Sequence, residues 1–397
     1  MTNRELIDRS KKVLFQNYRT QPIALVRGEG TYVYDADGKR YLDFIGGIAT
    51  VSVGHANAKV REAVVEQARL LWHASNLYVT EPQIRLAEKL VRHSKTLNRV
   101  FFCNSGAEAN EAAIKLARHY HVVNGHPERI EILCMRNSFH GRTMGALAAT
   151  GQPKYQQGFG PLPEGFRFLD YGDAAELERA VSEKTCAVLV EPVQGEAGVT
   201  PAPAGYLQKA RELCTKTGAL LLFDEVQTGM GRTGRFFACE HFGVEPDALT
   251  LAKGIAGGLP LGALLARDEI AQAFTPGTHA STFGGNPVTT AAASAVVDLL
   301  DGGLLDSARA MGEHLGARLR GLSGSSRRVA GERGLGLLRA LLLTEDLAPK
   351  VVASARERGL LVNSIGDRVL RLAPPLTVSS SEIDEATRIL LEAISQA

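Results

Sequence analysis

The chain of 397 residues carries 45 lysine and arginine and 43 aspartate and glutamate residues, which gives a formal net charge of +2. Charges of both signs are mixed along the sequence, so neither nucleic acid nor a membrane surface is an expected partner. The length exceeds what one ordinary hydrophobic core organises, which predicts two domains or one large domain with a smaller one.

The composition of the N-terminus and the spacing of the cysteines indicate in which cellular compartment the protein works. Residues 1–18 are polar and charged and have no apolar core of a signal peptide. No stretch reaches the roughly 18 uninterrupted apolar residues of a membrane span. The five cysteines are scattered without CxxC spacing, which favours free thiols over disulfides or a zinc site. We therefore expect a cytoplasmic protein without a metal site.

Along the first three quarters of the chain, helical patterns alternate with short apolar runs. Residues 31–44 alternate around an Asp-Gly turn, which predicts a β-hairpin. Continuous apolar runs of five or six residues are typical of strands buried on both faces of a parallel sheet. Such runs lie at 99–103, 131–135, 187–192, 219–224, 248–253 and 262–266, and amphipathic helices are predicted at 57–72, 81–94, 107–120 and 204–218. The alternation predicts an α/β fold with a mostly parallel central sheet.

After about residue 300 the pattern changes to that of a smaller α+β unit. The predicted elements are a helix at 306–322, strands within 331–343, a helix at 351–359, strands at 360–364 and 368–374, and a helix at 381–395. We therefore expect an N-terminal segment (1–50) that packs with the small domain, a large domain (51–295) and a small C-terminal domain (296–397).

Three polar residues lie at the carboxyl ends of predicted strands, at the sheet edge where ligands of α/β proteins bind: Glu191, Asp224 and Lys253. A lysine among apolar neighbours loses solvation, so its pKa falls and its amine becomes a nucleophile. An enzyme that uses pyridoxal phosphate needs such a lysine to condense with the aldehyde, and an acid to keep the pyridine nitrogen protonated. Taken alone, Lys253 is better interpreted as a lysine that snorkels from a strand end, although the GGLPLG that follows favours the functional interpretation. An isolated Asp224 could instead serve a metal site, but no cluster of His, Asp and Glu at ligand spacing accompanies it.

The motif NSGAEANEAAIKLA (104–117) follows the first of these strands and opens a helix. Asn104 or Ser105 can cap this helix, and Gly106 and Ala107 expose N–H groups at its positive end, which is where a phosphate binds. Without other evidence an ordinary capped helix is the better interpretation.

The loop NSFHGRT (137–143) supplies side chains suited to a flat, anionic ligand. Phe139 can stack on an aromatic ring, and the guanidinium of Arg142 suits a carboxylate, although Arg142 is equally a surface arginine. We expect His140 to be a hydrogen-bonded structural histidine rather than a catalytic base, because the lysine can move the protons.

Three further loops complete the set. In FDEVQTGMGRTG (223–234), Glu225 is expected to be structural, and Gln227 lies within reach of the cofactor's phenolic oxygen. In HASTFGGNP (279–287), Ser281 and Thr282 offer hydroxyl groups to a phosphate. EPVQGEAG (191–198) adds Glu196.

Together these motifs resemble those of the class III, fold-type I pyridoxal-phosphate aminotransferases, from about residue 20 to the C-terminus. The resemblance implies that pyridoxal phosphate is the cofactor, that Lys253 carries it, and that Asp224 pairs with its pyridine nitrogen. The implied cofactor contacts also include Ser105, Gly106, Ala107, Phe139, Val226, Gln227 and Thr282. Thr282 would reach the phosphate of the other subunit, which implies a homodimer with shared active sites.

The resemblance also implies two carboxylate sites. Arg142 would hold the α-carboxylate of the amino donor, and Arg371, in RLAPPL, that of glutamate or 2-oxoglutarate. Glu196 would pair with Arg371 while the ω-amino donor is bound, and Ser281 would also contact substrate.

Two positions favour an acylated ornithine as the donor. Ornithine aminotransferases have a tyrosine where this chain has Ile48, and the segment 71–83 also fits an acylated substrate. At Ala107 the commoner threonine of the family is missing, which removes one hydroxyl near the phosphate and should weaken cofactor binding modestly.

The expected reaction moves the δ-amino group of N2-acetyl-L-ornithine to 2-oxoglutarate, a step of arginine biosynthesis. The alternatives are transamination of N-succinylated substrates, an aminomutase of the glutamate-1-semialdehyde type, and a cofactor-free binding protein on the same scaffold. The pair of Glu196 and Arg371 argues against the aminomutase, and Lys253 with Asp224 argues against the binding protein.

Overall fold

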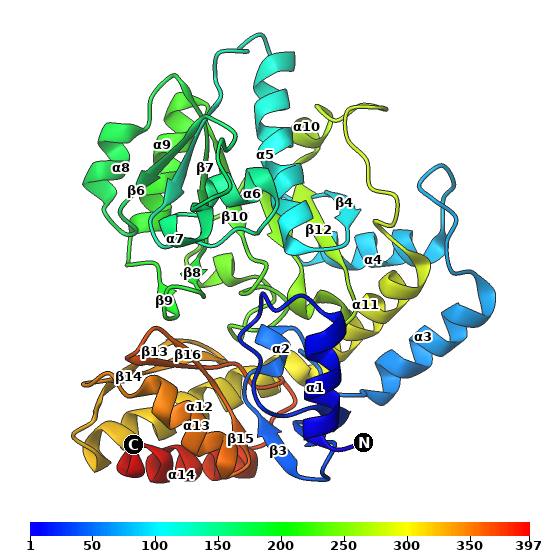
Figure 1. The fold of residues 1–397 in the computed structure, drawn as a ribbon. Coiled ribbons are helices and arrows are strands. Elements are labelled where there is room, and N and C mark those ends of the chain that lie inside the picture. The colour runs from blue at the N-terminus through cyan, green and yellow to red at the C-terminus, as the bar shows by residue number, and fades with distance from the viewer.

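The computed structural model describes all 397 residues, and its upper part in Figure 1 is built on a seven-stranded sheet. In spatial order the strands are β4 (Arg99–Cys103), β12 (Gly262–Ala266), β11 (Ala248–Leu251), β10 (Leu220–Asp224), β7 (Thr185–Val190), β5 (Glu131–Met135) and β6 (Phe166–Leu169). Strands β11, β10, β7, β5 and β6 are parallel, whereas β12 is antiparallel to both neighbours. The expected α/β fold with a mostly parallel sheet is confirmed.

Helices cover both faces of this sheet, so its strands are apolar throughout. In β7, Val188 belongs to the same buried cluster as Leu207 of α9 (Tyr206–Thr217), whereas the next residue, Leu189, clusters with Ala113 of α5 (Gly106–Val123). Alternate side chains of one strand therefore enter different layers. The ribbon shows α8 (Ala174–Ala180) beside α9, with α5 on the other face (Figure 1).

The lower part of the molecule contains two smaller sheets (Figure 1). One has the order β13 (Val329–Leu335), β14 (Leu338–Leu343), β17 (Val369–Leu372) and β16 (Asn363–Ile365), and the other has β1 (Leu25–Glu29), β2 (Tyr32–Asp35), β3 (Arg40–Asp43) and β15 (Leu360–Leu361). The hairpin predicted at 31–44 is β2–β3. Since β3 pairs with β15, the N-terminal strands lie beside the C-terminal segment. The domain limits at 50 and 295 stay a prediction.

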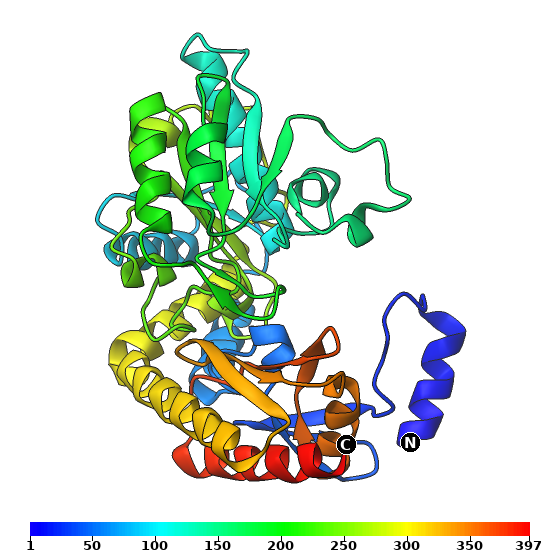
Figure 2. The ribbon, with the colours of Figure 1, turned by 90° about the vertical axis from the view of Figure 1, so that its left-hand side faces the viewer.

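Helices join and cover these sheets. α12 (Leu305–Ser325) and α13 (Ala348–Glu357) both pack against α14 (Ser380–Gln396), which runs along the lower edge of Figure 2. The chain crosses between the two parts through α11 (Pro287–Leu299), which packs against α3 (Ala58–Leu70) and α4 (Glu81–Arg92). The run Pro287–Ser325 is long and apolar enough to cross a membrane by composition. However, α11 lies within the fold, and a π-helical turn, η3 (Leu300–Leu304), interrupts the run.

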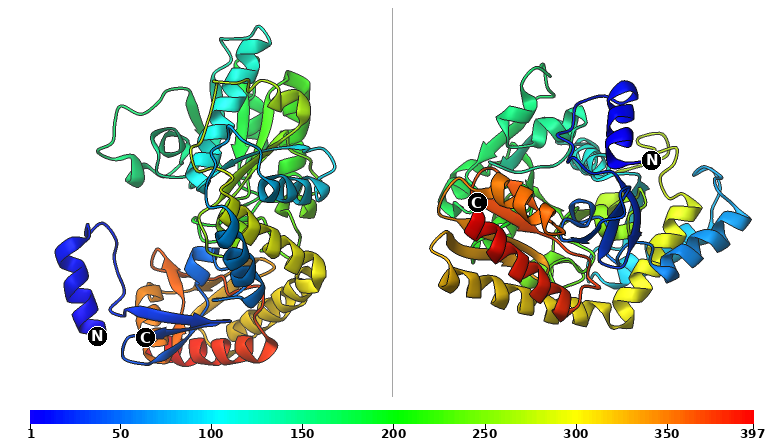
Figure 3. Two further views of the ribbon diagram at one scale, coloured as in Figure 1. Left: turned by 90° about the vertical axis from the view of Figure 1, so that its right-hand side faces the viewer. Right: turned by 60° about the horizontal axis from the view of Figure 1, so that its bottom comes forward.

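The remaining elements are short or peripheral. They are α6 (Met144–Ala149), α7 (Pro153–Gln156), β8 (Val193–Gln194), β9 (Thr200–Pro201), η1 (Ala238–His241), η2 (Lys253–Ala256), α10 (Asp268–Ala271) and the N-terminal α1 (Asn3–Val13). Helix α1 buries none of its residues and stands away from the body of the molecule (Figures 2 and 3).

A left-handed turn, α2 (Gly46–Ala49), precedes the pocket-lining residue Thr50. All four residues of α2 have positive φ, including Ile48 at 61°. A β-branched residue is strained in this region, at a cost of about 1–3 kcal/mol, so the surroundings must hold it there. Gly46 supplies part of that support, because a Cβ on it would lie 2.7 Å from the carbonyl oxygen of Ala373.

The β13–β14 turn makes a testable contact with the loop that follows β10. Gly336 has φ of 53°, and a Cβ on it would lie 2.3 Å from the carbonyl carbon of Thr233, whereas Gly366 has φ of 62° and open space around it. Both alanine variants therefore carry backbone strain of about 1–2 kcal/mol. We expect Gly336→Ala to lose about 2 kcal/mol more than Gly366→Ala in urea unfolding, because only the former displaces backbone. Equal losses would show that the contact carries no stability.

Candidate active site

A cavity of about 440 Å³ opens at the carboxyl ends of β7 and β10, beside the start of α5. Ten of the predicted site residues line it: Ser105, Gly106, Ala107, Phe139, Arg142, Glu196, Asp224, Val226, Gln227 and Lys253. They come from segments far apart in the sequence and converge because parallel strands present their carboxyl ends at one edge.

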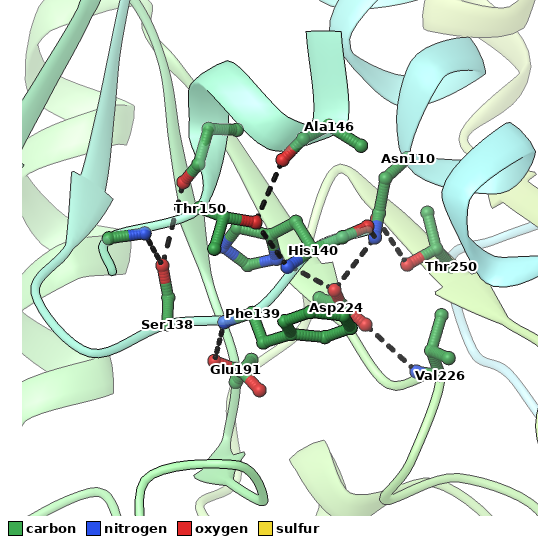
Figure 4. Close-up of polar contacts among 12 residues, drawn as sticks. Asn110, Ser138, Phe139, His140, Ala146, Thr150, Glu191, Asp224, Val226 and Thr250 are labelled. Atoms are coloured by element: carbon green, nitrogen blue, oxygen red, sulfur yellow. Dashed lines mark hydrogen bonds and ion pairs between the residues drawn. The ribbon is translucent and has the colours of Figure 1, made fainter. Parts of the chain in front are cut away.

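Asp224 is the last residue of β10 and is 4% exposed. One carboxylate oxygen, Oδ2, accepts a hydrogen bond from Asn110 Nδ2 at 2.8 Å and lies 2.7 Å from His140 Nδ1. The other, Oδ1, accepts the backbone N–H of Val226 at 3.0 Å. Figure 4 shows these partners arranged around the carboxylate. Three donors therefore hold the anion in one orientation at the edge of the cavity.

Hydrogen bonds to the backbone of His140 and to its ring fix the orientation of the ring. Its N–H donates to Thr150 Oγ1 at 3.0 Å, and its carbonyl accepts from Asn110 Nδ2 at 2.7 Å (Figure 4). Since a carboxylate only accepts, Nδ1 carries the hydrogen toward Asp224. Nε2 is buried and has no partner within the chain. His140 is thus hydrogen-bonded as expected, and its main partner is the acid of the site.

Asn110 is the site residue that sequence reasoning missed. It is 1% exposed, and Thr250 Oγ1 donates to its Oδ1 at 2.9 Å, which orients the amide toward Asp224. The available signal was a polar residue on the apolar face of a helix, one turn after Gly106.

The start of α5 has the geometry of an anion site. Ser105 caps the helix by accepting the N–H of Glu108 at 3.2 Å, so the N–H groups of Gly106 and Ala107 have no partner within the helix. A Cβ on Gly106 would lie 2.6 Å from Val226 Cγ1. Glycine is therefore required for the close approach of the helix to the segment after β10.

Lys253 lies two residues after β11, at the first position of η2, with φ of 44°. Its amine forms no hydrogen bond or ion pair within the chain and lines the cavity. Burial lowers the pKa of Lys253, opposed by the negative charge of Glu196 and helped by the positive charge of Arg371. Lys253 therefore offers an unpaired amine to the same cavity that is lined by the start of α5 and by Asp224.

Arg371, on β17, lies behind two residues that line the cavity, Glu196 and Gln227. It is 3% exposed, and its Nη1 lies 2.5 Å from Glu196 Oε1. Gln227 contacts both partners, since its Nε2 donates to Glu196 Oε1 at 3.1 Å and its Oε1 accepts from Arg371 at 3.4 Å. Burial raises the pKa of Glu196, but the nearby charges of Arg371 and Lys253 lower it more, so its pKa falls overall.

The aromatic wall is held by a second buried acid. Phe139 N–H donates to Glu191 Oε2 at 3.2 Å, at the end of β7 (Figure 4). Burial, and then the charge of Asp224, raise the pKa of Glu191.

Arg142 is exposed, and its guanidinium carbon lies 3.9 Å from the centre of the Tyr155 ring. Stacking of this kind orients the fork without using its N–H groups.

Three predicted residues do not line the cavity: Ser281, Thr282 and Arg371, which contacts the lining residues Glu196 and Gln227. Ser281 Oγ accepts from Asn104 Nδ2 at 3.2 Å, so it contacts the rim. Thr282 lines a different surface hollow, with His73 and Gly285. Ile48 is 48% exposed and does not line the cavity, although Thr50 does.

These groups fit pyridoxal phosphate. The free amides at the start of α5 suit its phosphate, Phe139 and Val226 line the cavity with apolar surface that suits its ring, and the fixed carboxylate of Asp224 suits a protonated nitrogen. The unpartnered amine of Lys253 suits its aldehyde.

Comparison with known proteins gives one consistent result. Residues 14–394 match the family model described as aminotransferase class-III. The chain is 50% identical to the acetylornithine aminotransferase of Myxococcus xanthus, over 96% of this chain and 95% of that protein. It is 51% identical to that of Gloeobacter violaceus, over 95% and 94%. A solved structure of the ornithine aminotransferase from Toxoplasma gondii, with partial occupancy of PLP at its active site, has a TM-score of 0.95 at 33% identity and covers 100% of this chain and 94% of its own.

Glu225, next to Asp224, generates a prediction about stability. Its carboxylate accepts the N–H groups of Ala238 and Cys239 at 2.5 and 2.8 Å, as expected of a structural acid. Burial raises the pKa of Glu225 to about 7. Between its unfolded pKa and pH 7 the folded state keeps a proton that the unfolded state loses, so this contribution to stability falls as the pH rises.

We therefore expect the difference in urea midpoint between the wild type and Glu225→Gln to shrink from pH 5 to pH 7. The glutamine cannot titrate, so its own curve lacks this slope. Glu183→Gln, at an exposed glutamate that makes no hydrogen bond or ion pair, serves as the control. Parallel pH curves for wild type and Glu225→Gln would contradict the assignment.

Proposed function

The chain belongs to the class-III aminotransferase family, and on this premise we propose that it transfers the δ-amino group of N2-acetyl-L-ornithine to 2-oxoglutarate. The products would be N-acetylglutamate 5-semialdehyde and glutamate, which assigns the protein to arginine biosynthesis. The near full-length identity to proteins named acetylornithine aminotransferase supports the acyl group. The observation that carries the two-substrate chemistry is the contact of Glu196 with Arg371 at 2.5 Å.

The protein is a pyridoxal-phosphate-dependent aminotransferase. When bound, pyridoxal phosphate supplies an aldehyde that takes up the amino group and a ring that accepts electrons. Asp224 would hold the proton on the ring nitrogen, in the orientation that Asn110, His140 and the Val226 N–H give its carboxylate. Ser105, Gly106 and Ala107 hold the phosphate at the positive end of α5.

Lys253 is assigned two tasks at one atom. Its Nζ would hold the cofactor through its aldehyde, and as a free amine it would move a proton between the substrate carbon and the C4′ carbon of the cofactor. Burial lowers the pKa of this amine, so a larger fraction is unprotonated near neutral pH than for an exposed lysine.

The two substrates present different charges to the same region. 2-Oxoglutarate brings a carboxylate that requires the guanidinium of Arg371, whereas the δ-amino end of acetylornithine does not. Glu196 neutralises Arg371 while the donor is bound and turns away for the dicarboxylate. Arg142 then serves the α-carboxylate of the donor, at the open side of the cavity. In a largely water-free pocket, an uncompensated guanidinium would be costly, so this exchange makes both complexes accessible.

We also infer a homodimer in the cytoplasm. Exposed apolar side chains gather on the segment 70–79 and the loop 281–286: Leu70, Trp72, Leu77, Tyr78, Val79 and Phe283. Hydrogen bonds from Asn76 Nδ2 to the carbonyls of Ser281 and Gly284 hold the two segments together. An apolar surface of this kind supports a protein interface. Thr282 lies in it, which supports its assignment to the phosphate of the second subunit.

The substrate assignment predicts an order of donors. With 2-oxoglutarate as acceptor, we expect kcat/KM for acetylornithine to exceed that for ornithine by about a hundredfold, since a pocket that lacks a partner leaves the charged α-amine of ornithine unpaired. 4-Aminobutyrate, which lacks the acylated α-amino group altogether, should also be a poorer donor than acetylornithine. Succinylornithine tests the acyl group directly. Lys253→Ala, which should release glutamate at no measurable rate, is the control. A higher kcat/KM for succinylornithine or ornithine would overturn the assignment.

The shared site predicts complementation between two variants. Lys253→Ala and Thr282→Ala would each be impaired. In a mixed dimer, however, one site would combine the intact Lys253 of one subunit with the intact Thr282 of the other. After random exchange, half the dimers are mixed and half their sites intact, so activity should rise toward about one quarter of the wild type. A mixture no more active than the mean of its components would show that Thr282 serves its own subunit.

A further inference from the structure

The loop 227–234 begins at the cavity and ends deep against the lower part of the molecule. At its start, Gln227 contacts the side chains of Glu196 and Arg371. Further along, Gly234 has φ of 84° and lies against Arg309 of α12. One short loop therefore contacts both the site and α12 in the lower part of the molecule.

Arg232, in this loop, is a buried cation without a counter-ion. It is 2% exposed and forms no salt bridge. Its Nη1 donates to the carbonyls of Leu337 at 3.2 Å and Pro374 at 2.5 Å, and its Nη2 has no partner. Burial lowers the pKa of Arg232 to about 10. A buried charge satisfied only by carbonyl groups costs free energy that an apolar side chain would avoid.

The two carbonyl groups identify what Arg232 holds. Leu337 directly precedes β14, and its N–H donates back to the carbonyl of Arg232 at 3.0 Å. Pro374 follows β17 and lies three residues after Arg371. β14 and β17 are paired, with Ala340 opposite Arg371. A single guanidinium therefore joins the ends of two adjacent strands and attaches both to the loop that carries Gln227.

We propose that Arg232 is a positioning residue that sets the place of Arg371 behind Glu196 and Gln227 at the cavity, and so selects for the dicarboxylate substrate. The inference rests on the proposed role of Arg371 in binding the α-carboxylate of glutamate and 2-oxoglutarate. Arg232 fixes the backbone just beyond Arg371, while Gln227 holds its side chain. Without Arg232, β17 keeps its pairing with β14 but loses its register against the loop. The guanidinium of Arg371 then leaves the position that a carboxylate requires.

The test compares Arg232→Met and Arg232→Lys with the wild type. Methionine keeps an unbranched chain without the charge, and lysine restores the charge and its donors at a shorter reach. Arg235→Met is the matched control, because Arg235 is exposed in the same stretch and makes no hydrogen bond. The holoenzyme is titrated with glutamate alone and with acetylornithine alone, and the absorbance of the bound cofactor gives the half-saturating concentration of each. Thermal unfolding is measured on the same samples.

For Arg232→Met, the half-saturating concentration of glutamate should rise about tenfold, as expected for a lost charged hydrogen bond, and that of acetylornithine should change by less than about twofold. Arg232→Lys should lie between Arg232→Met and the wild type, and Arg235→Met should match the wild type. Equal shifts for both amino acids, or variants that do not fold, would overturn the inference and leave Arg232 a general structural residue. A wild type that responds to glutamate but not to acetylornithine would instead contradict the proposed donor.

Discussion

One buried carboxylate constrains the rest of the site. Asp224 lies at the end of a strand buried on both faces, where water cannot solvate its charge, so the protein must supply the donors. Asn110 from α5, His140 from the loop after β5 and the N–H of Val226 do so. Each donor is fixed in turn, Asn110 by Thr250 and His140 by Thr150. The position of α5, and with it the anion site at Gly106 and Ala107, thus follows from the need to satisfy one acid.

The segment after Asp224 extends this constraint across the molecule. Glu225 holds the start of η1, Gln227 contacts Arg371, and Arg232 reaches the strand ends near Pro374. Close backbone contacts make the connection stiff, since Gly336 lies directly on Thr233. Closely packed backbone has few alternative arrangements, so we expect a displacement of the loop near Gln227 to displace the strand ends that Arg232 contacts. This explains why a loop of ordinary length can relate the cofactor site to an arginine carried by another sheet.

The sequence predicted what depends on local pattern. The apolar runs 99–103, 131–135 and 262–266 coincide with β4, β5 and β12, and the strand ends converge on one cavity. It did not predict that β12 runs antiparallel, because an apolar run has no direction, or the edge strand β6, whose pattern is mixed. Asn110 and Arg232 were missed because their partners are more than 100 residues away in sequence. The positive φ of Ile48 also depends on contacts far along the chain. The roles of the individual site residues stay predictions.

The same electrostatic problem recurs at the other end of the cavity, with a different solution. Asp224 has fixed donors because it is proposed to face the same cofactor nitrogen throughout. Arg371 instead faces the loop residue Glu196, whose side chain is 23% exposed. If the partner of Arg371 were always neutral, the positive charge of Arg371 would stay uncompensated when a substrate without a carboxylate at that end is bound. If the partner were an acid fixed in place, it would repel the second carboxylate of a dicarboxylate substrate. An acid that turns away, as proposed for Glu196, opposite an arginine fixed in place would satisfy both demands. Such an arrangement works only if the arginine is held by its backbone rather than by Glu196. The buried guanidinium of Arg232, joined to the carbonyl three residues beyond Arg371, meets that requirement.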